Sequence, residues 1–251
     1  AGVAVWHGCT IQFVSNPNVF SEATYLNLGW LSIPVTIIWI VAITNAVNFI
    51  DGLDGLAVGV SAISTAALVV IALLVQELNI AVILIALFGA CLGFIPYNMN
   101  PAKIFMGDTG SMFLGYIISA VSVMGSMKTV ATAVLIVPLL ALTVPITDTL
   151  LAIVRRKSSG VPIFSPDKNH LHHRLLAKGL NQKQVVLVMY ALTAFFSCTA
   201  LIVIHLSLWI GIAIVAIALV LFVLWARKLG VMQEIVPSPY QMEQKKKKDS
   251  D

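Results

Sequence analysis

The sequence predicts an all-α, polytopic integral membrane protein with about eight transmembrane segments, the first of them partial. Its 251 residues are 59% hydrophobic and only 10% charged, and the mean hydropathy is +0.96. Apolar runs of about 18 residues or more recur along the chain, and each is long enough to cross a hydrocarbon core of about 30 Å as a helix. Helices are the expected spanning form because backbone groups inside a bilayer have no water to bond. A soluble protein is excluded.

The expected spans follow these apolar runs. Residues 1–14 have the composition of the end of a spanning helix, and further spans are expected at about 31–49, 55–75, 80–97, 109–127, 130–153, 185–205 and 207–226. Residues 1–226 are therefore expected to form one multispan transmembrane domain that begins within an apolar run and lacks an N-terminal part. A polar, histidine-containing loop at 155–184 interrupts it, and a basic tail at 227–251 is expected to be disordered.

The basic residues predict how the chain is oriented. If residues 45–55 face the cytoplasm, fourteen of the fifteen Lys and Arg residues also lie inside, and only Lys128 lies outside. Cytoplasmic loops carry such an excess of positive charge. The polar clusters at 45–55, 98–111 and 155–178, and the C-terminus, are then all cytoplasmic. A transporter would be expected to place polar residues at mid-membrane depth in two repeats, and no such repeat is seen.

The first polar cluster reads Asn-Ala-Val-Asn-Phe-Ile-Asp-Gly-Leu-Asp-Gly and ends an apolar run. Its four polar side chains recur every three residues: Asn45, Asn48, Asp51 and Asp54. If the preceding helix continues through them, Asp51 and Asp54 face the same way and could share a cation. Carboxylates beside a bilayer are costly without compensation, so a functional site is the default interpretation. Glycines at 52, 55 and 59 would let a phosphate or metal approach the backbone.

The second cluster, residues 98–111, places Asp108 between two glycines at the start of the next expected helix. Free N–H groups at a helix N-terminus favour an anion such as phosphate. Asp108 would supply a carboxylate to Mg²⁺, which prefers oxygen ligands and often keeps phosphate oxygens as well. Alternatively, Asp108, Thr109 or Ser111 only caps the helix. The sequence leaves both interpretations open.

The third cluster holds three histidines within four positions: His170, His172 and His173, followed by Arg174. This pattern suits a metal or the oxygens of a diphosphate, and zinc is less favoured because its usual ligand spacing is missing. A basic loop resting on anionic lipid would explain the preceding residues 155–157 but not the histidines. Asp148, inside a span, either lines the same site or is neutralised by a neighbouring helix.

Taken together, three motifs resemble the polyprenyl-phosphate N-acetylhexosamine-1-phosphate transferases of glycosyltransferase family 4. They are Asn-Ala-Val-Asn-Phe-Ile-Asp-Gly-Leu-Asp-Gly-Leu at 45–56, Pro-Ala-Lys-Ile-Phe-Met-Gly-Asp-Thr-Gly-Ser at 101–111, and His-Leu-His-His-Arg at 170–174. They occur in the family's order with helices between them and cover most of the chain. Each motif alone is suggestive, and the combination is highly specific.

The resemblance implies a multispan enzyme that moves a sugar 1-phosphate from a UDP-sugar to a polyprenyl phosphate and releases UMP, with Mg²⁺ as cofactor and Mn²⁺ as a substitute. The His-x-His-His-Arg form is similar to the UDP-GlcNAc branch, which includes the TagO and WecA enzymes that start teichoic acid or surface polysaccharide. The MraY branch typically has His-His-His-Phe-Glu there. The family's earlier Asp-Asp pair is absent from this sequence, so the resemblance implies that about the first third is missing and that this chain alone is inactive.

The chemistry of the three clusters, together with the resemblance, suggests roles for individual residues. The expected catalytic residues are Asp51, Asp54, Asp108, His170, His172 and His173. The expected substrate-binding residues are Asn45, Asn48, Asn98, Lys103, Phe105 and Arg174. The expected metal ligands are Asp108, Asp51 and Asn48.

The expected partners are UDP-GlcNAc, undecaprenyl phosphate and membrane lipids, without nucleic acid, in a bacterial plasma membrane. A homodimer is one assembly that the sequence leaves open. The sequence leaves three alternative functions open. They are a phospho-MurNAc-pentapeptide transferase, a transporter of a lipid intermediate, and a non-catalytic scaffold.

Overall fold

The computed structural model describes residues 1–15, 25–128, 140, 142, 143, 146, 147, 149, 153, 171–204, 206 and 208–228. Its elements, in chain order, are α1 (Gly2–Trp6), β1 (Phe13–Ser15), β2 (Tyr25–Asn27), the 3-10 helix η1 (Gly29–Leu31), α2 (Ser32–Phe49), α3 (Leu56–Leu74), α4 (Leu78–Asn98), α5 (Gly107–Lys128), α8 (Leu171–Ala177), α9 (Gln182–Val203) and α10 (Leu208–Lys228). The prediction of an all-α, polytopic membrane protein is confirmed, apart from one short β-hairpin.

Five helices of the described part are long and apolar enough to cross a membrane: α2 together with η1, then α3, α4, α9 and α10. Their ends lie within about three residues of the expected spans because long apolar runs mark buried or lipid-facing helices clearly. The 22-residue helix α5 packs along α2. Most of the expected span at 130–153 lies outside the described residues, so the total of eight spans stays a prediction.

The N-terminal segment differs from its prediction. Residues 1–14 were expected to end a spanning helix, but α1 stops at Trp6 after five residues. Gly8 follows with φ +83°, a left-handed conformation that commonly ends helices. The chain then becomes extended, and the N–H of Ile11 donates to Oγ1 of Thr36 on α2 at 2.8 Å. Strand β1 pairs antiparallel with β2, with Phe13 opposite Asn27.

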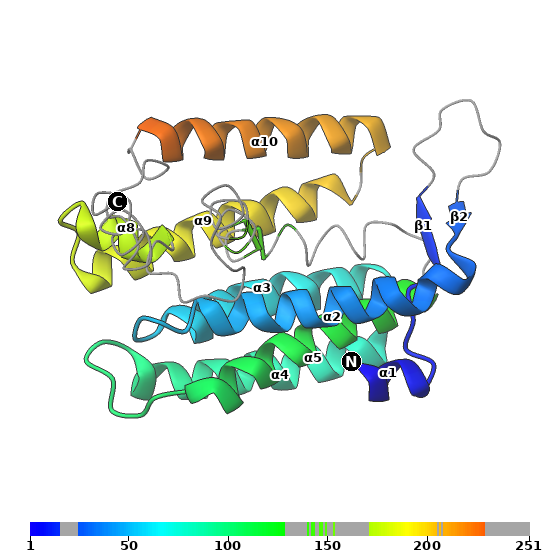
Figure 1. Cartoon of the computed structure of the whole chain (residues 1–251), viewed down its shortest axis with the longest axis horizontal. Helices are drawn as coiled ribbons and strands as arrows, with labels where there is room; N and C mark the ends of the chain where they lie inside the picture. The colour runs from blue at the N-terminus through cyan, green and yellow to red at the C-terminus, as the bar shows by residue number, and fades with distance from the viewer. Residues whose placement is uncertain are drawn as a thin grey trace, which may run out of the picture.

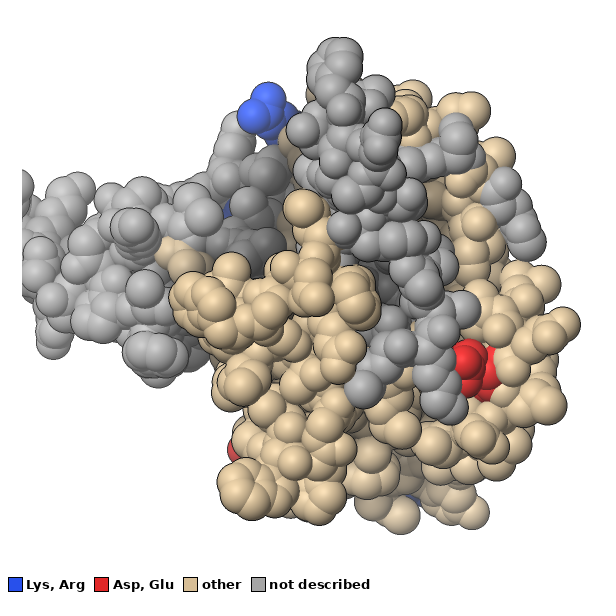
Figure 2. Space-filling model, turned by 90° about the vertical axis from the view of Figure 1, so that its right-hand side faces the viewer, with Lys and Arg blue, Asp and Glu red and all other residues tan. Residues whose placement is uncertain are grey.

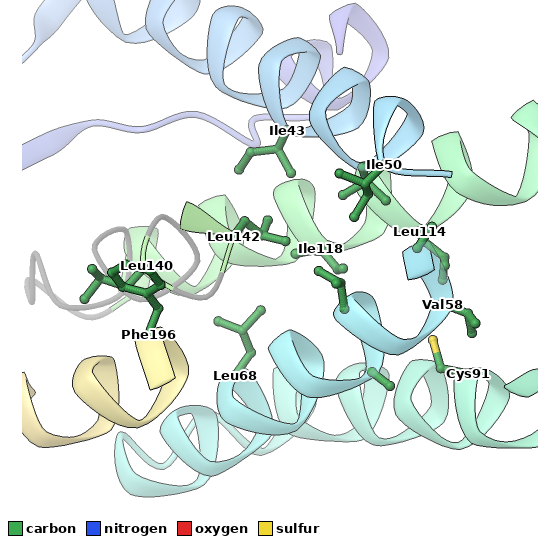
Figure 3. Packing of buried hydrophobic residues seen from close by; sticks show 14 of the residues in the cluster. Ile43, Ile50, Val58, Leu68, Cys91, Leu114, Ile118, Leu140, Leu142 and Phe196 are labelled. Carbon is green, nitrogen blue, oxygen red and sulfur yellow. The ribbon is translucent and has the colours of Figure 1, made fainter. Parts of the chain in front are cut away.

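Helix α3 is the centre of the bundle. Within its most apolar window, 72% of the residues are buried, against 22–44% for the other four candidate spans. It packs against α4, α9, α5 and α2, and Figure 3 shows buried side chains of the cluster around it, among them Leu68 of α3, Ile118 of α5 and Phe196 of α9. The first four long helices and α9 are thereby held as one packed unit.

Helices α2 and α5 approach each other closely. A Cβ atom added to Gly115 of α5 would lie 2.7 Å from the Cα of Thr44, so only glycine fits at that crossing. Farther along, Nε1 of Trp39 donates to Oγ of Ser122 at 3.0 Å. The two helices run in opposite directions in Figure 1. The C-terminal end of α2 therefore lies beside the N-terminal end of α5.

The polar connections gather at one end of the bundle. The turn between α2 and α3, the connection between α4 and α5, and helix α8 all lie at the left of Figure 1, whereas β1 and β2 lie at the right. Seen from that right-hand end, the described surface carries few charged side chains (Figure 2). Charged residues such as Asp51, Lys103 and Asp108 belong to or adjoin the connections at the opposite end. Which side of the membrane each end faces stays a prediction.

Candidate functional site

The site is built where α2 ends and α5 begins. Nδ2 of Asn48 donates to Oδ1 of Asp108 at 3.2 Å and to Oγ of Ser111 at 2.9 Å. The Ser111 hydroxyl in turn donates to the carbonyl of Gly107 at 3.1 Å. The amide of Asn48 thus fixes the carboxylate of Asp108 at the first turn of α5, and it does so across 60 residues of sequence.

Asp51 and Asp108 form an electrostatically coupled pair. Asp51 lies between α2 and α3, outside the candidate spans, and its pKa is raised from 3.8 to about 6. The larger cause is burial, which disfavours the charged carboxylate, and the second is the negative charge of Asp108. Two carboxylates that repel each other, one half-buried and the other exposed, make a favourable place for a cation.

Asp54 is not part of this pair of carboxylates. The expectation that Asp51 and Asp54 lie on one helical face is wrong, because α2 ends at Phe49 and the following residues form turns. Oδ2 of Asp54 accepts from Nδ2 of Asn100 at 3.0 Å and from the N–H of Ala102 at 3.1 Å. In this structure, Asp54 fastens the α4–α5 connection to the turn at residues 50–55.

Asn98 also joins the α4–α5 connection to the turn at residues 50–55, from a buried position. It is only 3% exposed, its Oδ1 accepts from the N–H of Gly55 at 3.1 Å, and its Nδ2 donates to the carbonyl of Ile104 at 3.0 Å. Asn45, by contrast, donates to the carbonyl of Val41 on its own helix at 2.7 Å. The structure thus gives both asparagines intramolecular bonds, and their expected substrate contacts stay predictions.

Side chains crowd the Cβ side of the glycines at 52, 55 and 59, although Gly52 itself is exposed. A Cβ atom on Gly52 would lie 2.9 Å from Nε2 of His172, and one on Gly55 would lie 2.9 Å from Sδ of Met99. A Cβ atom on Gly59 would overlap the ring of Tyr190. Protein side chains thus occupy the positions that Cβ atoms would take at these glycines, and the approach of a phosphate or metal to their backbone stays a prediction.

The histidine motif lies partly on a helix. The expected loop at 155–184 contains α8, and its His172 and Arg174 are only 1% and 4% exposed. The rings of His172 and His173 have centroids 4.3 Å apart, and His173 is partly exposed. Because Gly52 follows Asp51 directly, the contact with His172 brings the histidine motif to the aspartate pair. His170, Asp148 and residues 155–157 lie outside the described residues.

Two expected substrate-binding residues stand on the α4–α5 connection, shortly before Asp108. Lys103 is exposed, and its N–H donates to the carbonyl of Tyr97 at 2.8 Å. The side chain of Phe105 is 76% exposed. Both are therefore accessible beside the site, and their contacts with substrate stay predictions.

Three residues that support the site were missed at the sequence level. Nδ2 of Asn100 also donates to Oε1 of Gln182 at 2.9 Å, which ties the α4–α5 connection to the start of α9. The hydroxyl of Tyr190 donates to the carbonyl of Gly55. Gln182 and Tyr190 belong to a span whose apolar pattern predicts a helix but not its neighbours. Only tertiary packing shows that this helix faces the first motif.

The available side chains suit a hard cation. Asp51 and Asp108 provide carboxylate oxygens, and Asn48 adds an amide beside them. Among the described residues, no group of three or more His, Cys, Asp or Glu could hold a metal. Mg²⁺ is commonly held by one or two carboxylates while water and substrate phosphates complete its shell. The donor set therefore fits Mg²⁺ together with a phosphorylated substrate, and it does not resemble a closed structural metal site.

Comparison with known proteins adds a family match. The model for glycosyl transferase family 4 matches residues 1–126. A probable undecaprenyl-phosphate N-acetylglucosaminyl 1-phosphate transferase of Bacillus subtilis is 44% identical over 227 residues, which are 90% of this chain and 63% of that protein. A decaprenyl-phosphate N-acetylglucosaminephosphotransferase of Mycobacterium tuberculosis is 44% identical over 178 residues, 63% of this chain and 44% of that protein.

A second kind of relative also matches. A phospho-N-acetylmuramoyl-pentapeptide-transferase of Halalkalibacterium halodurans is 34% identical over 185 residues, which are 74% of this chain and 54% of that protein. The chain thus spans less than two thirds of the length of each of these three relatives.

Proposed function

Because the chain belongs to glycosyl transferase family 4, we propose that the full-length protein transfers GlcNAc 1-phosphate from UDP-GlcNAc to undecaprenyl phosphate and releases UMP. The product would be the first lipid-linked intermediate of a cell-wall or surface polysaccharide such as teichoic acid. The observation that carries the proposal is the pair of carboxylates at Asp51 and Asp108, at the polar end of an apolar bundle, with Asn48 orienting the carboxylate of Asp108.

Two observations favour GlcNAc over MurNAc-pentapeptide as the transferred sugar. The B. subtilis relative, named for N-acetylglucosaminyl transfer, aligns over 227 residues, whereas the H. halodurans relative, named for the muramoyl-pentapeptide, aligns over 185 at lower identity. The sequence His-Leu-His-His-Arg at 170–174 is also similar to the UDP-GlcNAc branch.

The chemical difficulty of this transfer is charge. An oxygen of the acceptor phosphate forms a bond to the β-phosphorus of UDP-GlcNAc, and the bond from that phosphorus to the bridging oxygen breaks, so that UMP leaves. The acceptor oxygen is already anionic and needs no base. Phosphoryl transfer is helped chiefly by positioning and by stabilising the developing charge. Mg²⁺, when bound, would neutralise the diphosphate and the leaving UMP.

Each residue of the site then has a defined task. Asp108 and Asp51 would hold the metal, and Asn48 keeps Asp108 oriented through its 3.2 Å hydrogen bond. We propose that His170, His172, His173 and Arg174 bind phosphate oxygens from the side of α8, since His172 already contacts the turn that carries Asp51. Asp54 and Asn98 maintain the shape of the site by tying its two connections together.

The position of the site suits one lipid and one soluble substrate. It lies at an end of apolar helices, where a polyprenyl phosphate can present its headgroup while its tail stays in the bilayer. Large apolar side chains stand exposed beside Asn48 and Asp108, among them Phe49, Met112 and Phe113, which are 42%, 42% and 56% exposed. We propose that this end faces the cytoplasm of a bacterial cell, where nucleotide sugars are available.

The test is UMP release by the full-length protein from UDP-GlcNAc and a short polyprenyl phosphate. We expect Mg²⁺-dependent UMP release that Asp108→Asn abolishes, while Glu77→Gln, a carboxylate at the opposite end of the bundle, retains it. Near wild-type turnover of Asp108→Asn at saturating Mg²⁺ would remove Asp108 from the metal role. Movement of a lipid intermediate without UMP release would support a transporter, and activity only with UDP-MurNAc-pentapeptide would support the muramoyl branch.

A further inference from the structure

We propose that Tyr190 of α9 is a positioning residue that holds the turn at residues 50–55 in the shape needed to bind the metal. This inference rests on the proposed function. Tyr190 lies eight residues into α9, and its hydroxyl donates to the carbonyl of Gly55, which follows Asp54 directly. Tyr190 itself need not touch the metal or the substrate, because it acts through the backbone of Gly55.

The peptide groups of Gly55 are held from two sides. Its N–H donates to Oδ1 of Asn98 at 3.1 Å, and its carbonyl accepts from Tyr190. Gly55 has φ +82°, a conformation that ordinary residues rarely adopt, so its backbone direction depends on these contacts and on the absence of a Cβ atom. Without the Tyr190 bond, Gly55 keeps the Asn98 contact on one side and only the N–H of Gly59, at 3.0 Å, on the other.

A second contact from α9 supports the same turn. Gln182, at the start of the helix, accepts from Asn100, and the same Asn100 nitrogen donates to Asp54. Helix α9 therefore reaches the turn twice, once through Asn100 and once directly through Tyr190. Because α8 precedes α9 and places His172 against Gly52, the histidine motif and the aspartate turn share α9 as their common support.

The contributions of the ring and of the hydroxyl of Tyr190 can be distinguished by mutation. The ring occupies the space beside Gly59, where a Cβ atom would overlap it. Tyr190→Phe keeps this packing and removes the hydrogen bond to Gly55, together with a longer contact of 3.9 Å between the hydroxyl and Sδ of Met99. Gly59→Ala instead pushes the ring away and should break the same bond by displacement. If both act through Gly55, the effect of Gly59→Ala should be smaller in the Tyr190→Phe background than in the wild type.

The experiment measures equilibrium binding of Mn²⁺, without substrates, by electron paramagnetic resonance on the full-length protein. We expect Tyr190→Phe to raise the Mn²⁺ dissociation constant about two- to tenfold, the range expected for one lost hydrogen bond. The turnover number should fall by a similar factor, and the KM for UDP-GlcNAc should change less. Tyr116→Phe, on α5, is the matched control and should leave both quantities unchanged.

The outcomes separate this inference from the proposed function. Tyr190→Phe with wild-type Mn²⁺ affinity would overturn the positioning role, even if the melting temperature falls. Additive effects of Gly59→Ala and Tyr190→Phe on Mn²⁺ affinity would overturn the route through Gly55. If the wild type binds Mn²⁺ but releases no UMP, the proposed function fails, while the affinity comparison still decides the role of Tyr190.

Discussion

Asn48 and Asp108 are joined by a 3.2 Å hydrogen bond although 60 residues separate them in the sequence. This bond connects the last turn of α2 to the first turn of α5, two helices that approach so closely that Gly115 has no room for a side chain. The close packing of α2 and α5 thus places the carboxylate of Asp108 beside the amide of Asn48. The proposed metal site is a consequence of how these two helices pack.

The raised pKa of Asp51 predicts a pH dependence of stability. Because the pKa rises from 3.8 to about 6 on folding, the folded protein holds this proton at pH values where the unfolded chain has lost it. The resulting stabilisation is present below about pH 4 and is lost as the pH rises through about 6. In metal-free protein, Asp51→Asn should therefore become more stable relative to wild type across this interval.

Melting temperatures of both proteins, measured from pH 4 to pH 7 with a chelator present, check this prediction. Added Mg²⁺ at pH 7 should stabilise the wild type more than Asp51→Asn. Parallel pH profiles for the two proteins would show that Asp51 ionises normally.

Asn98→Ala should destabilise the protein. The substitution leaves the N–H of Gly55 and the carbonyl of Ile104 without this buried partner, which costs about 1–3 kcal/mol. Asn45→Ala is the matched control, because the Asn45 amide bonds only the carbonyl of Val41 on its own helix, and it should change stability by about 0.5 kcal/mol or less. Equal unfolding free energies for the two variants would show that Asn98 does not fasten the connections.

Gly52→Ala should lower turnover by displacing α8. The new Cβ atom would lie 2.9 Å from Nε2 of His172, closer than side chains tolerate, so one of the two groups has to move. Gly93→Ala in α4 is the control, since nothing lies within 4 Å of its added Cβ atom. In a His172→Ala background the crowding is gone, so Gly52→Ala should add little further loss of UMP release. Wild-type turnover of Gly52→Ala alone would contradict the contact.

His172→Ala should reduce turnover by about tenfold or more, because it removes a side chain packed against the aspartate turn and proposed to bind phosphate. Lys178→Ala removes an exposed charge just beyond α8 and should leave UMP release nearly unchanged, as should Arg156→Ala. Similar small effects of all three substitutions would instead favour a loop that only rests on anionic lipid.

The sequence predicts the positions of the long helices well, but it does not predict which helices pack against one another. The apolar runs place α2, α3, α4, α9 and α10 closely, because burial in lipid or protein needs long uninterrupted apolar segments. Residues 1–14 are misjudged because their apolar composition also suits a short helix followed by a strand, and Gly8 decides between the two.

Within the site, the spacing of polar residues in the sequence does not predict which partners their side chains meet. The three-residue interval suggests that Asp51 pairs with Asp54, but α2 ends first, so Asp51 couples to Asp108 while Asp54 binds the α4–α5 connection. Likewise, His172 and Tyr190 pack against Gly52 and Gly59 from helices more than a hundred residues away in the sequence. Such contacts depend on tertiary packing, which periodicity does not encode.

The most direct test of the account is a Mn²⁺ titration of the full-length wild type beside Asp51→Asn and Asp108→Asn, at a pH near 7 and with UDP-GlcNAc present. We expect a bound Mn²⁺ ion in the wild type and a large loss of affinity in each variant, because both carboxylates contribute to one cation site. Undiminished Mn²⁺ binding in both variants would contradict a shared site at Asp51 and Asp108, whatever activity the protein shows.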